Sequence, residues 1–231
     1  MVAIAQSKIL IVVPSRFGSS FRKSEKLAKS MYPVNGVPMI HYSFLTIKDL
    51  PYDKIISTDD KLVKSEAAAF GLQVHDRKRN LADDRATLDE VIYDLAKEFK
   101  HEIFVFLPPT SPLRTAEDIE CAINLFLNTE NADSLISVTH EHRSCWTKVS
   151  SAGFCTPLYV PDKNRQEERG YFVANGAIFI SYRDAILRSK RKVSGRVITY
   201  VMEQNHSVDV HNEQDVQIAE FYLIRNEWLL K

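Results

Sequence analysis

Residues 8–29 carry the side chains whose types and spacing are best suited to binding a phosphate group. The segment begins with a run of aliphatic residues, 9–13 followed by Pro14, which is typical of a strand buried on both faces of a parallel sheet. The loop after this strand has one glycine and three serine hydroxyls, and then the cations Arg22, Lys23, Lys26 and Lys29. Ligands in open α/β sheets bind at the carboxyl ends of the strands, where loops present backbone N–H groups and cations. The position of the loop therefore favours a phosphate site, and an ordinary solvated basic loop is the alternative.

Four further segments place polar side chains beside expected strands or helices: residues 57–60, 81–84, 107–114 and 207–211. Prolines at 108, 109 and 112 stiffen one of these loops, which reduces the entropy lost when a loop is fixed and suits a preformed pocket wall. Residues 57–60 are equally well explained by helix capping alone. The polar residues of 207–211 alternate as they would at the end of a strand.

The elements that must position these segments alternate between strand and helix. Strand patterns cover residues 9–13, 54–57, 72–75, 103–107 and 134–138, and helix patterns cover 40–50, 60–70, 87–99 and 116–127. Two helices begin with capping boxes, at Thr87 with Glu90 and at Thr115 with Asp118. Such alternation predicts a parallel α/β sheet with right-handed crossovers.

This alternation breaks after Val138. Residues 140–170 are polar and irregular, with a charged run at 162–169, and a stretch of that length is usually functional or interfacial if it is not disordered. Regular patterns resume at 177–180 and 197–201, and an amphipathic helix from about Glu213 to Leu229 follows. We expect one domain over residues 1–231, with an inserted arm at about 140–170.

Composition excludes several classes of protein. Lys and Arg number 30 and so do Asp and Glu, so no charge excess indicates general binding to nucleic acid or membrane surfaces. The sequence has neither a run of about 18 apolar residues nor a signal-peptide pattern at its start. The cysteines at 121, 145 and 155 have unrelated spacings, which predicts neither a disulfide framework nor a zinc site and favours a reduced, cytoplasmic protein.

Taken together, the motifs resemble those of a known family. The strings VPSRFGSS, NGVPMI, ISTDD, LADDRAT, PPTSPLRTAEDI, DSLISV, NGAIFI and SVDVHNEQD occur in the order seen in the acylneuraminate cytidylyltransferases. That family contains the CMP-sialic acid synthetases and relatives that activate legionaminic and pseudaminic acids, with the 3-deoxy-manno-octulosonate (KDO) cytidylyltransferases as more distant cousins. The resemblance runs from Ile9 to about Glu220, and STDD and PTSPLR are its most specific parts.

The resemblance implies a Rossmann-like three-layer α/β sandwich with a mostly parallel sheet, of the nucleotide-diphospho-sugar transferase type, and a homodimer with an exchanged arm. It also implies a reaction in which the anomeric hydroxyl of a nonulosonic acid attacks the α-phosphorus of CTP, giving a CMP-sugar and pyrophosphate with Mg²⁺. Such an enzyme would activate an acidic sugar for a bacterial-type surface glycan such as lipopolysaccharide.

Three other functions remain open. The string PSRFGSS fits the KDO enzymes equally well, whereas STDD, LADD, DSLISV and NGAIFI favour the nonulosonate branch. A family member that binds CTP without catalysis is an alternative from a different class. A glycosyltransferase-like protein would need a DxD motif after a mid-chain strand, and none is evident.

Carried over by position, the resemblance implies a set of site residues. Arg16, Lys29 and Asp209 are the expected catalytic residues. The nucleotide is expected at Pro14, Ser15, Arg16, Ser19, Lys29, Arg77, Asp84 and Thr87, and the sugar at Pro108, Thr110, Ser111, Arg165, Arg169 and Asn175. Asp209 and His211 are the expected metal ligands, for Mg²⁺ or alternatively Mn²⁺. Lys23 and Lys26 are rivals of Lys29, because the loop is about four residues longer than the family pattern.

Several departures from the family fall at functional positions. Residues 18–21 read GSSF where GSKG is usual, so the loop lysine is absent and Arg22 or Lys23 is a substitute. Pro108 replaces a glutamine and Val173 replaces an arginine that meets the sugar carboxylate, which predicts a sugar other than ordinary N-acetylneuraminic acid. His211 stands where a second metal aspartate is usual; its alternative interpretation is a surface histidine at the entry to a helix.

Overall fold

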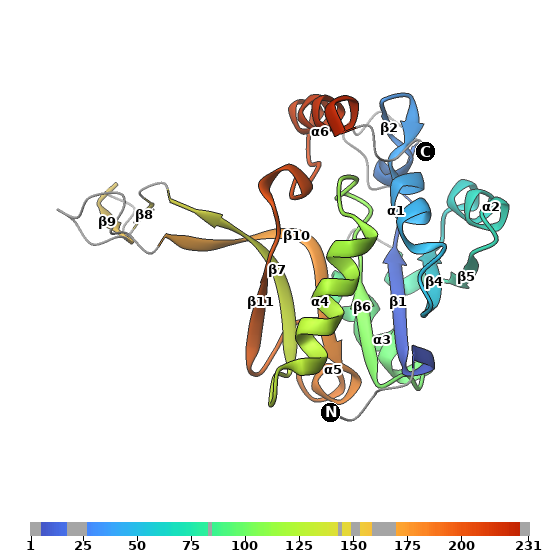
Figure 1. The fold of residues 1–231 in the computed structure, drawn as a ribbon. Helices are drawn as coiled ribbons and strands as arrows, with labels where there is room; N and C mark the ends of the chain where they lie inside the picture. The colour runs from blue at the N-terminus through green and yellow to red at the C-terminus, as the bar shows by residue number, and fades with distance from the viewer. Residues whose placement is uncertain are drawn as a thin grey trace.

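The computed structural model describes residues 6–17, 27–82, 85–142, 145–148, 153–158 and 170–226. Within them a seven-stranded sheet runs through the centre of the molecule in the order β11-β7-β10-β6-β1-β4-β5 (Figure 1). Its strands are β1 (Ile9–Pro14), β4 (Asp53–Thr58), β5 (Gln73–Asp76), β6 (Ile103–Phe106), β7 (Ser134–Glu141), β10 (Tyr171–Tyr182) and β11 (Val197–Val201). Every pairing is parallel except those of β10, which runs antiparallel to both β6 and β7. The expected, mostly parallel sheet is thereby confirmed.

Helices cover both faces of this sheet. They are α1 (Met39–Ile47), α2 (Lys61–Ala69), α3 (Leu88–Glu98), α4 (Ala116–Asn128), α5 (Arg183–Ser189) and α6 (Glu213–Asn226). Alternate residues of β1 point to opposite faces, so Ile9, Ile11 and Val13 pack with α1, α2 and α4, while Leu10 and Val12 pack with α3 and α5. A strand with aliphatic residues at every position is buried on both faces in this way. Because helices cover both faces of the sheet, the predicted three-layer sandwich is confirmed.

Local sequence signals explain where several helices begin. Thr87 and Thr115 cap α3 and α4, each in a capping box with the residue three positions on. Asp60 caps α2 by accepting from the N–H groups of Leu62 and Val63. Helix α5 was not predicted, because it has only seven residues directly after β10 and is too short for a clear periodicity.

Besides the two apolar cores on the faces of the sheet, a third cluster of buried apolar side chains holds α6 at the end of the sheet where the parallel strands finish. Val216 and Ala219 of α6 pack against Met39 and Tyr42 of α1 and against Val34, which lies in the short pair formed by β2 (Pro33–Val34) and β3 (Val37–Pro38). Residues 207–211 lead into α6 from the short helix η4 (Gln204–His206) and are not a strand, contrary to the alternation in their sequence. Trp228, within the expected closing helix, lies outside the described residues.

The expected arm projects from one side of the molecule (Figure 1). The outer ends of β7 and β10 continue beyond the sheet as a two-stranded ribbon, in which Glu141 pairs with Tyr171. Further out, β8 (Trp146–Lys148) pairs with β9 (Cys155–Pro157). The described parts of the arm are therefore more regular than their sequence suggested. Of the helices within the described residues, none is long and apolar enough to cross a membrane.

Candidate active site

A cavity of about 200 Å³ opens where β1, β5 and β6 end. The residues around it come from the loops after these strands, from the segment before β2 and from the start of α3. They are Pro14, Ser15, Arg16, Lys29, Ser30, Arg77, Ala86, Thr87, Leu88, Val91, Pro108, Pro109 and Thr110. Because parallel strands end at one edge of the sheet, segments up to 96 positions apart meet here, as the sequence predicted.

The loop after β1 is held at its start by neighbouring elements. Ser15 N–H donates to the carbonyl of Ser57 (3.0 Å), and Phe17 N–H donates to Asp59 Oδ1 (2.9 Å). The hydroxyls of Ser15 and Ser30 lie 2.6 Å apart and share a hydrogen bond. Arg16 lies between these anchored residues, so its backbone position at the cavity is fixed by the STDD loop.

Arg77 contributes a second guanidinium to the same wall. Its side chain donates from an Nη atom to the Ser57 carbonyl at 2.8 Å, and its Nε has no hydrogen-bond partner among the described residues. Burial lowers the pKa of Arg77 to about 10, with Asp59 opposing the shift and Arg16 adding to it. Arg77 therefore stays charged at neutral pH, and an anion in the cavity would relieve its repulsion with Arg16.

Lys29 reaches the cavity from the other side. It lies in the short helix η2 (Lys29–Met31), and its Nζ is 3.2 Å from His211 Nδ1. The other ring nitrogen of His211 lies 2.8 Å from Asp209 Oδ2. Burial lowers the pKa of Lys29 below its ordinary value, and the charges of Asp209 and Asp215 oppose this shift. Of the three candidate lysines, Lys29 therefore lies at the site, whereas Lys23 and Lys26 fall outside the described residues.

Asp209 lies next to a segment that lines the cavity, and its surroundings hold it there. The next residue, Val210, donates its N–H to the carbonyl of Thr110 at 2.8 Å. Gly176 approaches so closely that a Cβ built on it would lie 2.5 Å from Asp209 Oδ2. Asp209 Oδ1 is buried and has no hydrogen-bond partner among the described residues. A buried carboxylate oxygen with no partner is suited to a cation.

Asn175 and Arg114 connect segments of the chain near the cavity by hydrogen bonds. Asn175 Oδ1 accepts from Ser137 Oγ (2.6 Å), and its Nδ2 donates to Ser207 Oγ (2.9 Å), in the interruption where the β7–β10 pairing shifts register. Arg114 is only 1% exposed and donates to the carbonyls of Pro108 and Ala177. In this arrangement both side chains hold loops in place, and the expected contact of Asn175 with a sugar stays a prediction.

Eight of the sixteen predicted site residues line the cavity. They are Pro14, Ser15, Arg16, Lys29, Arg77, Thr87, Pro108 and Thr110. Ser111 is 1% exposed behind that wall. Ser19, Asp84, Arg165 and Arg169 lie outside the described residues. Ala86, Leu88 and Val91 also line the cavity and were not predicted. Val91 belongs to the apolar stripe of α3, and such a stripe indicates packing in the core when the neighbouring elements are unknown.

Comparison with known proteins decides the family. The family model described as cytidylyltransferase matches residues 10–224. The chain belongs to the cytidylyltransferase family. The N-acylneuraminate cytidylyltransferase of Streptococcus agalactiae serotype V is 30% identical to it over 217 residues, which are 90% of this chain and 51% of that protein. The chain thus spans about half the length of such curated relatives.

Two further proteins resemble this cytidylyltransferase, one in sequence and one in fold. The post-translational flagellin modification protein B of Campylobacter coli is 27% identical and is covered over 95% of its length, with 94% of this chain. Among solved structures, CMP:2-keto-3-deoxy-manno-octonic acid synthetase complexed with CTP superposes with a TM-score of 0.68 at 16% identity, covering 95% of this chain and 100% of the other. At that identity the superposition supports the Rossmann-like nucleotidyltransferase fold alone.

Proposed function

We propose that this cytidylyltransferase transfers CMP from CTP to the anomeric hydroxyl of an acidic nine-carbon sugar and releases pyrophosphate. The observation that carries the proposal is the cavity at the strand ends, where Arg16, Lys29 and Arg77 converge in a chain of this family. These cations have the charge needed to bind a triphosphate.

The same residues account for the chemistry of the transfer. Negative charge grows on the leaving pyrophosphate as the sugar oxygen attacks the α-phosphorus, and fixed cations stabilise that charge without reorganising. The apolar side chains of Leu88 and Val91 on one wall exclude water, which strengthens these electrostatic interactions. The stiff 108–112 loop on the other wall is suited to holding the sugar in line with the phosphorus.

Mg²⁺ is part of the proposal, with Asp209 as its protein ligand. The buried, unpartnered Oδ1 of Asp209 fits a hard cation that prefers oxygen and often takes only one or two carboxylates beside substrate phosphates. When bound, the ion would neutralise phosphate charge and polarise the phosphoryl group. No group of three or more His, Cys, Asp or Glu side chains within the described residues is arranged as a complete metal site, so substrate oxygens would supply the remaining ligands.

The sugar is proposed to be a nonulosonic acid other than ordinary N-acetylneuraminic acid. The relatives named N-acylneuraminate cytidylyltransferase support the acidic-sugar class. Val173 is 45% exposed on β10, two residues before Asn175, and Pro108 lines the cavity. Neither offers the polar contact expected at its position, so the sugar must be recognised through other groups.

A second candidate function is CTP binding without turnover. It is favoured by His211, which stands at the second metal position and is hydrogen-bonded to Asp209. A KDO-type reaction is the alternative within the same chemistry, and the fold likeness to the octonic acid synthetase is compatible with it.

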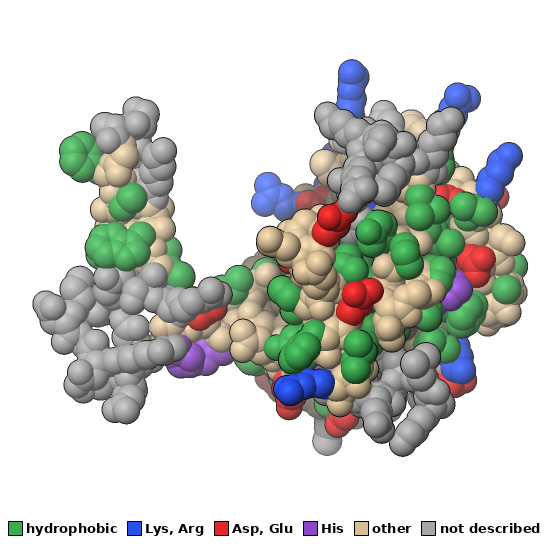
Figure 2. Space-filling view, turned by 90° about the horizontal axis from the view of Figure 1, so that it is seen from above, with side chains coloured by type: hydrophobic (Ala, Val, Ile, Leu, Met, Phe, Trp, Pro, Cys, Tyr) green, Lys and Arg blue, Asp and Glu red, His purple; other side chains and the backbone are tan. Residues whose placement is uncertain are grey.

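The assembly is proposed to be a homodimer that forms through the arm, in the cytoplasm, where CTP is supplied. Large apolar side chains are exposed along the arm, at Trp146, Phe154, Leu158, Phe172 and Val173. Figure 2 shows this part standing clear of the body with hydrophobic groups on its surface. An apolar ribbon of this kind needs a covering surface, and a second copy of the chain would supply one.

The test is pyrophosphate release from CTP with a panel of nonulosonic acids and KDO, run with Mg²⁺ and in parallel with Mn²⁺. We expect turnover with a nonulosonic acid, lost in Asp209→Asn. Turnover with KDO alone would favour the KDO reaction. CTP binding without turnover on any sugar would favour the second candidate. Absence of CTP binding would refute the proposal, and N-acetylneuraminic acid as the best substrate would refute its sugar assignment.

A further inference from the structure

Both ring nitrogens of His211 are occupied by neighbouring side chains. Nδ1 lies 3.2 Å from Lys29 Nζ, and Nε2 lies 2.8 Å from Asp209 Oδ2. A lysine ammonium can only donate hydrogen bonds, and an ionised carboxylate can only accept them. The partners therefore select the neutral tautomer in which Nδ1 accepts from Lys29 and Nε2–H donates to Asp209.

This tautomer leaves His211 unsuited to binding a metal ion. A ligating imidazole must direct the lone pair of a deprotonated nitrogen at the metal. Nε2 carries the proton, and the lone pair of Nδ1 faces Lys29. His211, at the second metal position, therefore has both ring nitrogens hydrogen-bonded to protein side chains.

Hydrogen bonds hold the main chain around His211 in place independently of Lys29. His211 N–H donates to Asp215 Oδ2 (2.8 Å), and the same oxygen accepts from Asn212 N–H (3.0 Å) at the entry to α6. On the other side Val210 N–H is bonded to the Thr110 carbonyl. With its main chain held and its ring bonded to Asp209, His211 is the more restrained member of the pair, and the long, flexible lysine side chain is the one that is positioned.

We propose that His211 is a positioning residue for Lys29, which holds the ammonium at the cavity wall for the triphosphate, and that it does not bind the metal. The inference rests on the proposed function, because it gives a partner to a lysine of the proposed CTP site. A lysine side chain that is already ordered loses less rotamer entropy when CTP binds.

The experiment is a double-mutant cycle in CTP binding, measured by calorimetry in EDTA and again with Mg²⁺. The variants are His211→Phe, Lys29→Met and the double substitution. His211→Phe keeps a ring and removes both hydrogen bonds, and the 67% exposed side chain makes misfolding an unimportant risk. Gln214→Ala, at an exposed position next to the same helix entry, is the matched control.

We expect His211→Phe to weaken CTP binding about tenfold in EDTA, as loss of a hydrogen bond to a charged group does. In the Lys29→Met background the same change should have no further effect, because the positioned group is gone. An equal loss in both backgrounds, or no loss in the wild-type background, would overturn the inference. So would a loss seen only with Mg²⁺, which would identify His211 as a metal ligand. Wild-type protein that binds no CTP would instead refute the proposed function itself.

Discussion

At the residue scale, Lys29 carries a partly buried charge that disfavours folding and is suited to binding an anion. Its partial burial lowers its pKa, because an ammonium loses hydration there, and Asp209 and Asp215 restore only part of the loss. A lysine whose folded pKa lies below its unfolded value destabilises the folded state at neutral pH. That penalty is present below the folded pKa and is relieved as the pH rises towards the unfolded value of 10.5.

We therefore predict that Lys29→Met unfolds at a higher urea concentration than the wild type at pH 7 in the absence of nucleotide. The difference should shrink as the pH is raised towards 10.5, since the wild-type lysine then loses its proton. The same variant should bind CTP more weakly. A variant that is less stable than wild type at pH 7 would show that the Lys29–His211 contact outweighs the burial of the charge.

Gly176 is a second residue whose identity the site requires. Its φ of +71° is a conformation that side chains other than glycine rarely adopt, and any Cβ would displace the carboxylate of Asp209. Gly71 is a matched control, because its φ is +69° and a Cβ there would meet nothing within 4 Å. We predict that Gly176→Ala and Gly71→Ala both lose about 1 kcal/mol of stability from the backbone conformation alone. Only Gly176→Ala should also reduce turnover, measured as pyrophosphate release. Equal turnover in the two variants would show that Asp209 takes no part in the reaction.

At the scale of elements, the start of α3 serves both the fold and the cavity. Thr87 caps the helix through its hydroxyl and also lines the cavity, whereas Glu90 completes the same capping box from outside it. We predict that Thr87→Ala and Glu90→Ala each reduce the free energy of unfolding, by about 1 kcal/mol for the lost threonine cap. CTP affinity, measured by calorimetry, should fall in Thr87→Ala and stay unchanged in Glu90→Ala. Equal effects on affinity would mean that the cap acts on the site only by ordering the helix.

The same elements show which parts of the structure were predictable from sequence. The caps of α3 and α4 and the buried strands were predicted because each depends on a few adjacent residues. The convergence of the 14–16, Arg77 and 108–110 segments also followed, since parallel strands end at one edge. The Lys29–His211 contact was not predictable, because it joins residues 182 positions apart through a segment with no regular pattern. The role of Arg114 was not predictable either, because its carbonyl partners lie in the loop after β6 and in β10, which only the folded chain brings together.

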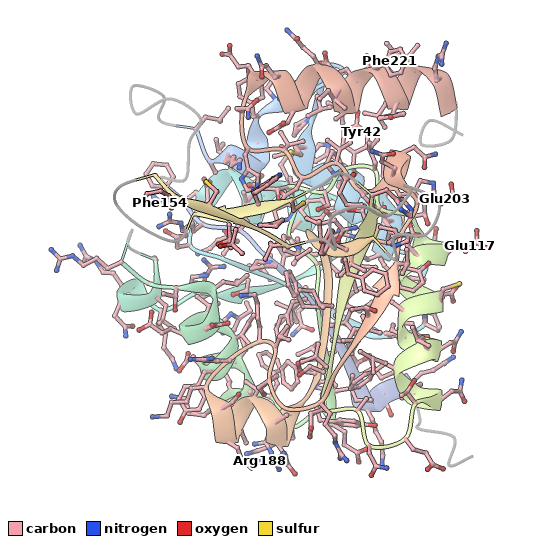
Figure 3. The ribbon with its side chains drawn as sticks, turned by 90° about the vertical axis from the view of Figure 1, so that its left-hand side faces the viewer. Tyr42, Glu117, Phe154, Arg188, Glu203 and Phe221 are labelled. Atoms are coloured by element: carbon pink, nitrogen blue, oxygen red, sulfur yellow. The ribbon has the colours of Figure 1, made fainter. Side chains whose placement is uncertain are left out.

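At the scale of the whole molecule, exposed large apolar side chains gather on two parts of the described chain. One is the arm, and the other is the outer side of α6, where Ile218, Phe221 and Ile224 lie at helical spacing. Figure 3, which looks at the molecule from the side of the arm, places Phe154 on the arm and Phe221 on α6 at the top of the body. The arm is the better candidate for self-association, because a thin two-stranded ribbon has no core of its own and is marginally stable in water.

We therefore predict that the chain is a dimer in solution and that the arm holds it together. Phe154→Ser with Leu158→Ser should shift the molecular mass, measured by light scattering during size-exclusion chromatography, from dimer to monomer. Ile224→Ser is the matched control, since Ile224 is 67% exposed and Phe154 is 74% exposed, yet only Phe154 lies on the arm. If Ile224→Ser dissociates the dimer and the arm variant does not, α6 is the interface. Because a large apolar side chain buried at an interface commonly contributes about 2 kcal/mol or more to association, the arm double variant should raise the dissociation constant at least several hundred-fold.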